Sequence, residues 1–185
     1  MIETVELPIS HRLLNHGPVV LVSSAHGEAR NVMAASWCKP LDFDPPKITI
    51  VIDKKSFTWA LIEASSEFVL NIPGRSLAPQ VFAAGSRSGR DGDKFDATGL
   101  VPRASRIVKA PSVEGCSAWL ECRLIPEPHN QVSYDLLIAE VVSASADTAA
   151  FRNGRWVFED EGLRTLHYVA GGGFLLTGEE LEVQA

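Results

Sequence analysis

A short polar stretch carries residue types that bind anions. Lys54, Lys55, Ser56 and Thr58 place two cations and two hydroxyls at the expected start of a helix. The unpaired N–H groups and the positive dipole end of a helix N-terminus form a natural seat for a phosphate group. The alternative is that Ser56 only caps the helix while the lysines are solvated, which is a common role for serine. The residues alone leave both interpretations open.

A second candidate for anion binding is the loop of residues 85–95. It combines the glycines Gly85, Gly89 and Gly92 with two serines and three cations. Backbone amides in a loop of this composition can wrap phosphate oxygens. The same composition is also typical of a mobile surface loop, so it does not decide between the two.

Residues 30–37 form a third candidate, of a different kind. The stretch begins with polar residues, passes through Ala34, Ala35 and Ser36, and ends on Trp37, with a Pro45-Pro46 turn further along. Small side chains in a strand leave backbone N–H and C=O groups open to a flat ligand, whereas a run of valine or leucine would cover them. The alternative is an ordinary core strand, which such apolar residues also favour.

Length and composition indicate one globular unit. The chain has 185 residues, of which 45% are hydrophobic and 22% charged, so we expect a single domain over residues 1–185 with short N- and C-terminal extensions. A net charge of −6 argues against a nucleic-acid partner, because phosphate backbones bind clustered basic surfaces. No apolar run has the length of a signal peptide or a membrane span, which predicts a cytoplasmic protein without a membrane partner.

The cysteines also favour a cytoplasmic location. Cys38, Cys116 and Cys122 are odd in number and form no Cys-x-x-Cys pair, so we expect reduced thiols and no metal site. Cys122 alternates with leucines and is expected to be buried in a strand. Cys38 follows Trp37 directly, and a redox role remains an alternative to a structural one for this residue.

Strand-like segments dominate the chain. Periodicity predicts a helix that Ser56 caps and a second helix that Gly85 closes. Many strands with two or three short helices indicate a closed or partly closed barrel, although periodicity does not separate a barrel from a sandwich. The expected strands cover residues 18–24, 28–37, 47–53, 117–125 and 134–143, with a hairpin at 151–157 and the second helix at 76–84.

Four motifs together resemble one known family. Residues 31–37, 44–46, 68–73 and 93–95 are similar to segments of the flavin reductase-like, FMN-binding split-barrel family, which includes flavoredoxin. The resemblance runs from about Gly17 to about Gly173 and keeps the order of the motifs. It implies a mainly β fold with a few short helices, arranged as a split β-barrel of Greek-key type.

The resemblance also implies a cofactor, FMN, and a set of residues around it. The flavin would carry the chemistry, so no catalytic side chain and no metal ligand are expected. Ser56 and Thr58 would hold the phosphate region, and the small-residue strand would face the ring, with Tyr168 near it from the glycine-rich segment 167–174. The implied cofactor-binding residues are Asn31, Met33, Ala34, Ala35, Ser36, Trp37, Ser56, Thr58, Ser88, Gly89, Lys94 and Tyr168.

One departure from the family concerns nicotinamide handling. Many members carry a histidine just before a strand that ends in Gly-Glu-Val, whereas this chain has Tyr134 at the histidine position and Ala139 at the glycine. His129 lies five residues earlier and is a possible substitute. This departure weakens the expectation that the chain handles NADH or NADPH more than the expectation that it binds flavin.

These residues and the resemblance favour an NAD(P)H:flavin oxidoreductase. One barrel leaves no room for a separate dinucleotide-binding domain, so NADH or NADPH would stack on the exposed flavin, deliver hydride to N5 and leave, giving ping-pong kinetics. The alternatives are a flavoredoxin-type electron carrier and a barrel that has lost flavin. The family implies a homodimer with flavin sites at the interface, and a monooxygenase or an electron-transfer protein as a further partner.

Overall fold

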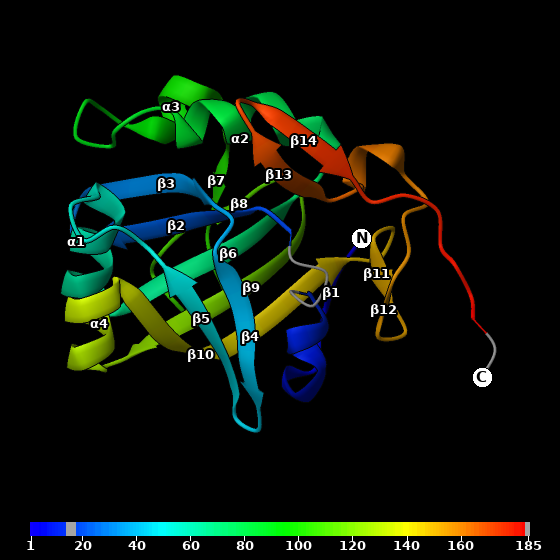
Figure 1. Ribbon diagram of the computed structural model, residues 1–185, viewed down its shortest axis with the longest axis horizontal. Helices are drawn as coiled ribbons and strands as arrows, with labels where there is room; N and C mark the ends of the chain where they lie inside the picture. Colours follow the sequence, from blue (N-terminus) through cyan, green and yellow to red (C-terminus); the bar gives the residue numbers. More distant parts are fainter. Residues whose placement is uncertain (14–17, 184–185) are drawn as a thin grey trace.

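The computed structural model describes residues 1–13 and 18–183, so Gly17, where the family resemblance begins, lies outside the described residues. Its main feature is an antiparallel sheet in the order β3-β2-β6-β9-β10-β5-β4, with β1 added beside β10 (Figure 1). The strands of this sheet are β1 Ile2–Thr4, β2 Val20–His26, β3 Ala29–Ala35, β4 Cys38–Phe43, β5 Pro46–Val51, β6 Glu67–Pro73, β9 Cys116–Ile125 and β10 Leu136–Asp147.

The sheet curls into a barrel, and the two strands at its edges follow one another in the chain. β3 and β4 end the hydrogen-bonded order, and residues 36–37 join them. The barrel is therefore open between these two strands. The predicted fold class, mainly β with a few short helices in a split barrel, is confirmed.

The hairpin of β2 and β3 follows the prediction closely. Gly27 in its turn has φ +58°, a conformation that glycine adopts without strain, and Val20 pairs with Ala35 at the open end. The predicted strand 28–37 was too long, because Ser36 and Trp37 leave the sheet. The Trp37 carbonyl instead accepts a hydrogen bond from Val51 N at 3.0 Å, where the chain turns into β4.

The core has two parts, one on each face of the central strands. Ile50, Phe68 and Leu70 belong to a cluster inside the barrel, whereas Val69 and Trp119 belong to a second cluster on the outer face. Because neighbouring side chains of a strand point to opposite faces, β6 is buried on both sides. The outer face must therefore be covered, and helices cover it.

The helices are short and lie around the rim and outer face of the barrel (Figure 1). They are α1 Phe57–Ser65, α2 Ala78–Gly85, α3 Lys94–Thr98 and α4 Pro128–Tyr134, with 3-10 turns η1 Leu7–Leu13, η2 Arg75–Leu77 and η3 Glu161–Leu163. The remaining short strands are β7 Pro102–Arg103, β8 Ser112–Val113, β11 Phe151–Arg152, β12 Arg155–Trp156, β13 Leu166–Ala170 and β14 Gly173–Leu176.

One strand in the C-terminal half differs from its predicted bounds. The predicted strand 134–143 begins only at Leu136, because Tyr134 ends α4 and Asp135 adopts a left-handed conformation with φ +53°. α4 buries none of its residues, so it has no apolar periodicity that would reveal it. The glycine-rich segment is the turn of the β13–β14 hairpin, in which Gly171 and Gly172 have φ +57° and +84°.

The predicted hairpin across Asn153-Gly154 is confirmed as β11 and β12. Within residues 1–13 and 18–183, none of the helices combines the length and the apolar character needed to span a membrane.

Candidate functional site

Two pockets adjoin each other along β3. The polar pocket, about 120 Å³, lies between β3, the start of α1 and the loop after α2, and the aromatic pocket, about 240 Å³, lies between β3, α2 and the β13–β14 hairpin. Ala34 and Gly85 line both. The polar pocket is lined by Asn31, Met33, Ala34, Ser56, Phe57, Thr58, Ala84, Gly85, Arg87, Ser88, Gly89 and Lys94. The aromatic pocket is lined by Val19, Ala34, Ala35, Ser36, Val81, Phe82, Gly85, Ser86, Tyr168 and Phe174.

Three hydroxyl groups line the polar pocket, and each already accepts a hydrogen bond. Ser56 is the N-cap of α1, and its Oγ accepts from Trp59 N at 3.1 Å. Thr58 is buried, and its Oγ1 accepts from Asn31 Nδ2 at 2.7 Å. Ser88 Oγ accepts from Arg90 N at 3.2 Å.

These three hydroxyls are donors to whatever occupies the pocket. A hydroxyl has one proton to donate, and no residue in the described part of the chain accepts it from Ser56, Thr58 or Ser88. With the start of a nine-residue helix beside them, the hydroxyl protons and the dipole favour an acceptor with negative charge. Ser56 therefore both caps α1 and lines the pocket, so the two alternatives drawn from the sequence are compatible.

Lys94 adds a positive charge to this pocket. It is 4% exposed, and its Nζ donates to the carbonyls of Ala84 at 2.5 Å and Arg87 at 2.9 Å. Burial lowers the pKa of Lys94 to about 8, so the amine is still mainly charged at neutral pH. Among residues 1–13 and 18–183 no carboxylate forms an ion pair with it. A bound anion would supply the missing negative charge.

Asn31 joins the sheet to both walls of the polar pocket. Its Nδ2 holds Thr58 of α1, and a Cβ on Gly89 would lie 2.2 Å from its Oδ1. Position 89 therefore has room only for glycine, because the loop main chain passes directly against this amide. Asn31 Oδ1 is buried and has no hydrogen-bond partner among the described residues, so it is available as an acceptor for a ligand O–H or N–H.

Lys54, one of the two lysines ahead of α1, does not contribute as the sequence indicated. Lys54 Nζ turns to α4, where it donates to Val132 O at 2.6 Å and lies 3.1 Å from Asp135. Its side chain stabilises the junction of α1 and α4 and lines neither pocket. Because the sequence did not reveal α4, it did not reveal this partner.

The aromatic pocket combines small residues of β3 with three aromatic rings. Phe82 comes from α2, and Tyr168 and Phe174 face each other across the β13–β14 hairpin with ring centroids 5.6 Å apart. A Cβ on Gly85 would lie 3.3 Å from Ala34 Cβ, so small residues are needed for α2 to approach β3. The pocket presents an aromatic and aliphatic wall, and apolar and aromatic side chains of this kind suit a planar ring.

Sequence reasoning missed Phe82 and Phe174 as members of this pocket. Phe82 falls inside the predicted helix 76–84, and Phe174 follows the glycine-rich segment, but nothing in their spacing relates them to residues 34–36. The contact depends on the β13–β14 hairpin, which was not predicted.

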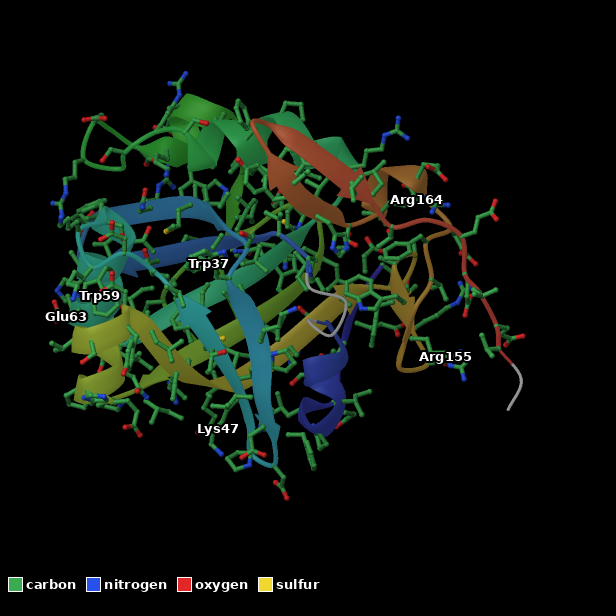
Figure 2. All side chains as sticks on the ribbon, viewed as in Figure 1. Trp37, Lys47, Trp59, Glu63, Arg155 and Arg164 are labelled. Carbon is green, nitrogen blue, oxygen red and sulfur yellow. The ribbon has the colours of Figure 1, made fainter. Side chains whose placement is uncertain are left out.

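Trp37 and the Tyr134 position lie outside both pockets. Figure 2 labels Trp37 at the link between β3 and β4, where the residue is 73% exposed. Tyr134 is 61% exposed, and its ring lies edge-on to the His129 ring within α4, with the ring centroids 5.6 Å apart. Apart from Trp37, every residue that the family resemblance assigned to the cofactor lines one of the two pockets. That these residues bind a flavin stays a prediction.

The three cysteine thiols are buried, and burial makes them unreactive. Cys38, Cys116 and Cys122 are free and buried, and the expected burial of Cys122 in a strand is confirmed. Burial raises the pKa of the Cys38 thiol to about 12, so the reactive thiolate is scarce at neutral pH. This environment favours a structural role for Cys38 over a redox one.

Comparison with known proteins connects this geometry to one family. The family described as "Flavin reductase like domain" matches residues 12–170. An uncharacterized protein of Escherichia coli K12, YddH, is 44% identical over 180 residues, which cover 96% of this chain and 95% of that protein.

Two solved structures are similar over most of the chain. The crystal structure of an FMN-binding domain of a flavin reductase-like enzyme from Shewanella baltica OS155 is 46% identical with a TM-score of 0.97, and the match covers 100% of this chain and 98% of that chain. Flavoredoxin of Desulfovibrio vulgaris (Miyazaki F) is 25% identical with a TM-score of 0.76, covering 90% and 89% of the two chains.

The close packing of Gly89 against Asn31 can be tested without a ligand. Gly89→Ala should lower the free energy of unfolding by about 1–3 kcal/mol, because the new methyl group would overlap the buried Asn31 amide. Gly178→Ala is the matched control, since a Cβ there meets nothing within 4 Å and the backbone is not left-handed. Urea denaturation measures both variants. Equal stability of the two would show that the loop does not press against Asn31.

Proposed function

The chain belongs to the flavin reductase-like family, and from that premise we propose that it is an FMN-binding oxidoreductase that accepts hydride from NADH or NADPH. One observation carries the proposal. Three hydroxyls with no acceptor, and Lys94 with no carboxylate partner, in the described part of the chain meet at one end of a site whose other end is aromatic. FMN has the same layout, with a phosphate monoester at one end and a planar ring at the other.

The residues present suit each part of FMN. Ser56, Thr58 and Ser88 would donate to the phosphate, and Lys94 would balance its charge. Asn31 Oδ1, which is buried without a partner in the part of the chain that the structure describes, would accept from a hydroxyl of the ribityl chain. When bound, FMN supplies the hydride and electron chemistry, which none of these side chains can perform.

β3 offers a hydrogen-bonding edge for the ring. Because β3 ends the hydrogen-bonded order of the sheet, alternate backbone N–H and C=O groups point away from β2 and have no strand beside them in the described part of the chain. Ala34, Ala35 and Ser36 at the end of this strand line the aromatic pocket. Their small side chains would leave this edge accessible to the polar edge of an isoalloxazine.

Exposed apolar residues near the site support a homodimer as part of the proposal. Trp37, Tyr168 and Leu175 are 73%, 50% and 65% exposed. Large exposed apolar residues of this kind are typical of surfaces that another chain covers. A second copy of the chain would cover Trp37 and complete the wall around the ring, which is the role that the resemblance gives to a partner subunit.

The second candidate function is a flavoredoxin-type carrier that exchanges electrons with a protein partner. Two observations favour it: the similarity to flavoredoxin, and the position of Tyr134, which replaces the family histidine and lies outside both pockets. In this alternative the FMN site is the same, but NADH and NADPH are not substrates.

Anaerobic reduction of the FMN-loaded protein separates these functions. We expect NADH or NADPH to bleach the flavin absorbance, because the nicotinamide has direct access to an open flavin face. Dithionite is the positive control for a reducible flavin. Bleaching by dithionite but by neither nucleotide would contradict the reductase and leave the carrier. A protein that takes up no FMN would contradict both.

The phosphate seat can be tested with the double variant Ser56→Ala, Thr58→Val. FMN affinity should fall by at least about 100-fold, because each lost hydrogen bond to a charged group contributes about 1.5–3 kcal/mol. Riboflavin, which lacks the phosphate, should lose affinity only through the broken Asn31–Thr58 hydrogen bond, and therefore less than FMN does. Ser65→Ala is the matched control on α1, since that hydroxyl donates to Leu61 O within the helix. Fluorescence titration with unchanged FMN affinity would remove Ser56 and Thr58 from the site.

The buried amine predicts a pH dependence of FMN binding. Phosphate stabilises the charged form of Lys94, so binding raises its pKa from the value of about 8 in the free protein. FMN affinity should therefore be highest below pH 8 and fall as the pH rises above that value, because the free protein then loses the proton that the complex retains. Riboflavin affinity should not fall in this range, and Lys94→Met should remove the dependence. A parallel fall for both flavins would argue against Lys94 as the phosphate partner.

A further inference from the structure

The loop between α2 and α3 forms one wall of the polar pocket and is fixed at both ends. At its start, Lys94 Nζ holds the carbonyls of Ala84 and Arg87. At its end, Asp93 accepts from Arg30 Nε at 2.6 Å. Between these anchors, residues 88–92 cross from α2 toward the start of α1, and Gly89 rests on Asn31.

Arg90 connects the middle of this loop to α1. Its guanidinium carbon lies 5.6 Å from the centroid of the Phe57 ring, and its Nη2 donates to the main-chain carbonyl of Lys55 at 3.4 Å. Its backbone N–H donates to Ser88 Oγ. Phe57 is the first residue of α1 and lines the polar pocket. Arg90 therefore joins the two walls that carry the hydroxyl donors.

The other contacts of Arg90 do not account for its position. Across residues 1–13 and 18–183 it forms no ion pair, and it does not line the polar pocket. Its contacts to Phe57 of α1 and to Lys55 just before α1 involve an exposed guanidinium, and in such a place a cation–π contact and a hydrogen bond are each weak. Weak exposed contacts across the mouth of a pocket can open and reform, in contrast to the buried Lys94 and Asn31 contacts.

We propose that Arg90 is a positioning residue that fastens residues 88–92 to α1 and so sets the residence time of the phosphate end of the bound flavin. The inference rests on the proposed function, since it concerns the same pocket. A ligand whose phosphate lies under this loop leaves only after the loop separates from α1. The strength of the Arg90 bridge then governs the dissociation rate and has little effect on the association rate.

Stopped-flow displacement of FMN tests the bridge. Arg90→Ala should raise the FMN dissociation rate about three- to tenfold, the size expected from one exposed cation–π contact and one exposed hydrogen bond. The riboflavin dissociation rate should not change, because riboflavin has no phosphate under the loop. Arg90→Lys keeps the charge but loses the planar guanidinium group that contacts Phe57. FMN should therefore also dissociate faster from this variant than from the unaltered protein.

Lys55→Ala is the matched control for charge. It removes one positive charge from the same rim, but it leaves the bridge intact because Arg90 contacts the main chain of Lys55. It should lower the association rate at low salt and leave the dissociation rate unchanged. If Arg90→Ala behaves like Lys55→Ala, with only its association rate altered, Arg90 acts through charge alone and the proposal is overturned.

Hydrogen exchange of the ligand-free protein gives a readout that needs no flavin. Amides of residues 88–92 should exchange several-fold faster in Arg90→Ala than in Lys55→Ala or the unaltered protein. Equal exchange rates in all three proteins would overturn the proposal that Arg90 fastens the loop to α1, even if FMN binds well. Faster exchange in a protein that binds no FMN would support the bridge but contradict the proposed function, so the two failures are distinguishable.

Discussion

The site depends on the buried hydrogen bond between Asn31 of β3 and Thr58 of α1. It fixes the start of α1 against the edge strand of the barrel, and the same amide supports the loop at Gly89. Because Asn31 holds Thr58 directly and supports Gly89 next to Ser88, one side chain of the sheet positions both walls of the pocket. Rigid placement of this kind is what a phosphate site needs, since donors fixed in advance lose little entropy on binding.

The split of the barrel supplies the other half of the site. A closed barrel would pair both edges of β3, whereas the opening between β3 and β4 leaves one edge available. α2 approaches this edge closely because Ala34 and Gly85 are small, and the β13–β14 hairpin adds the aromatic wall. No Asp, Glu, His, Lys or Arg is among the described residues that line the aromatic pocket, and under the proposed function the bound cofactor would perform the chemistry.

Local patterns could be predicted from the sequence, and long-range contacts could not. The Ser56 cap and the β2–β3 hairpin depend on neighbouring residues, so they were predictable. The partner of Lys54 is in α4, which has no buried face and therefore no periodic signal. Phe174 reaches the site only through a hairpin closed by two left-handed glycines. The family resemblance grouped most of the site residues, and their spacing alone does not.

The most direct test of this account is a crystal structure of the protein soaked or co-crystallised with FMN. It should place the phosphate within hydrogen-bond distance of the Ser56, Thr58 and Ser88 hydroxyls, with the ring against Ala34 and Ala35 in the aromatic pocket. A flavin whose phosphate lies in solvent or in another cavity, with the hydroxyls of α1 unused, would contradict the account.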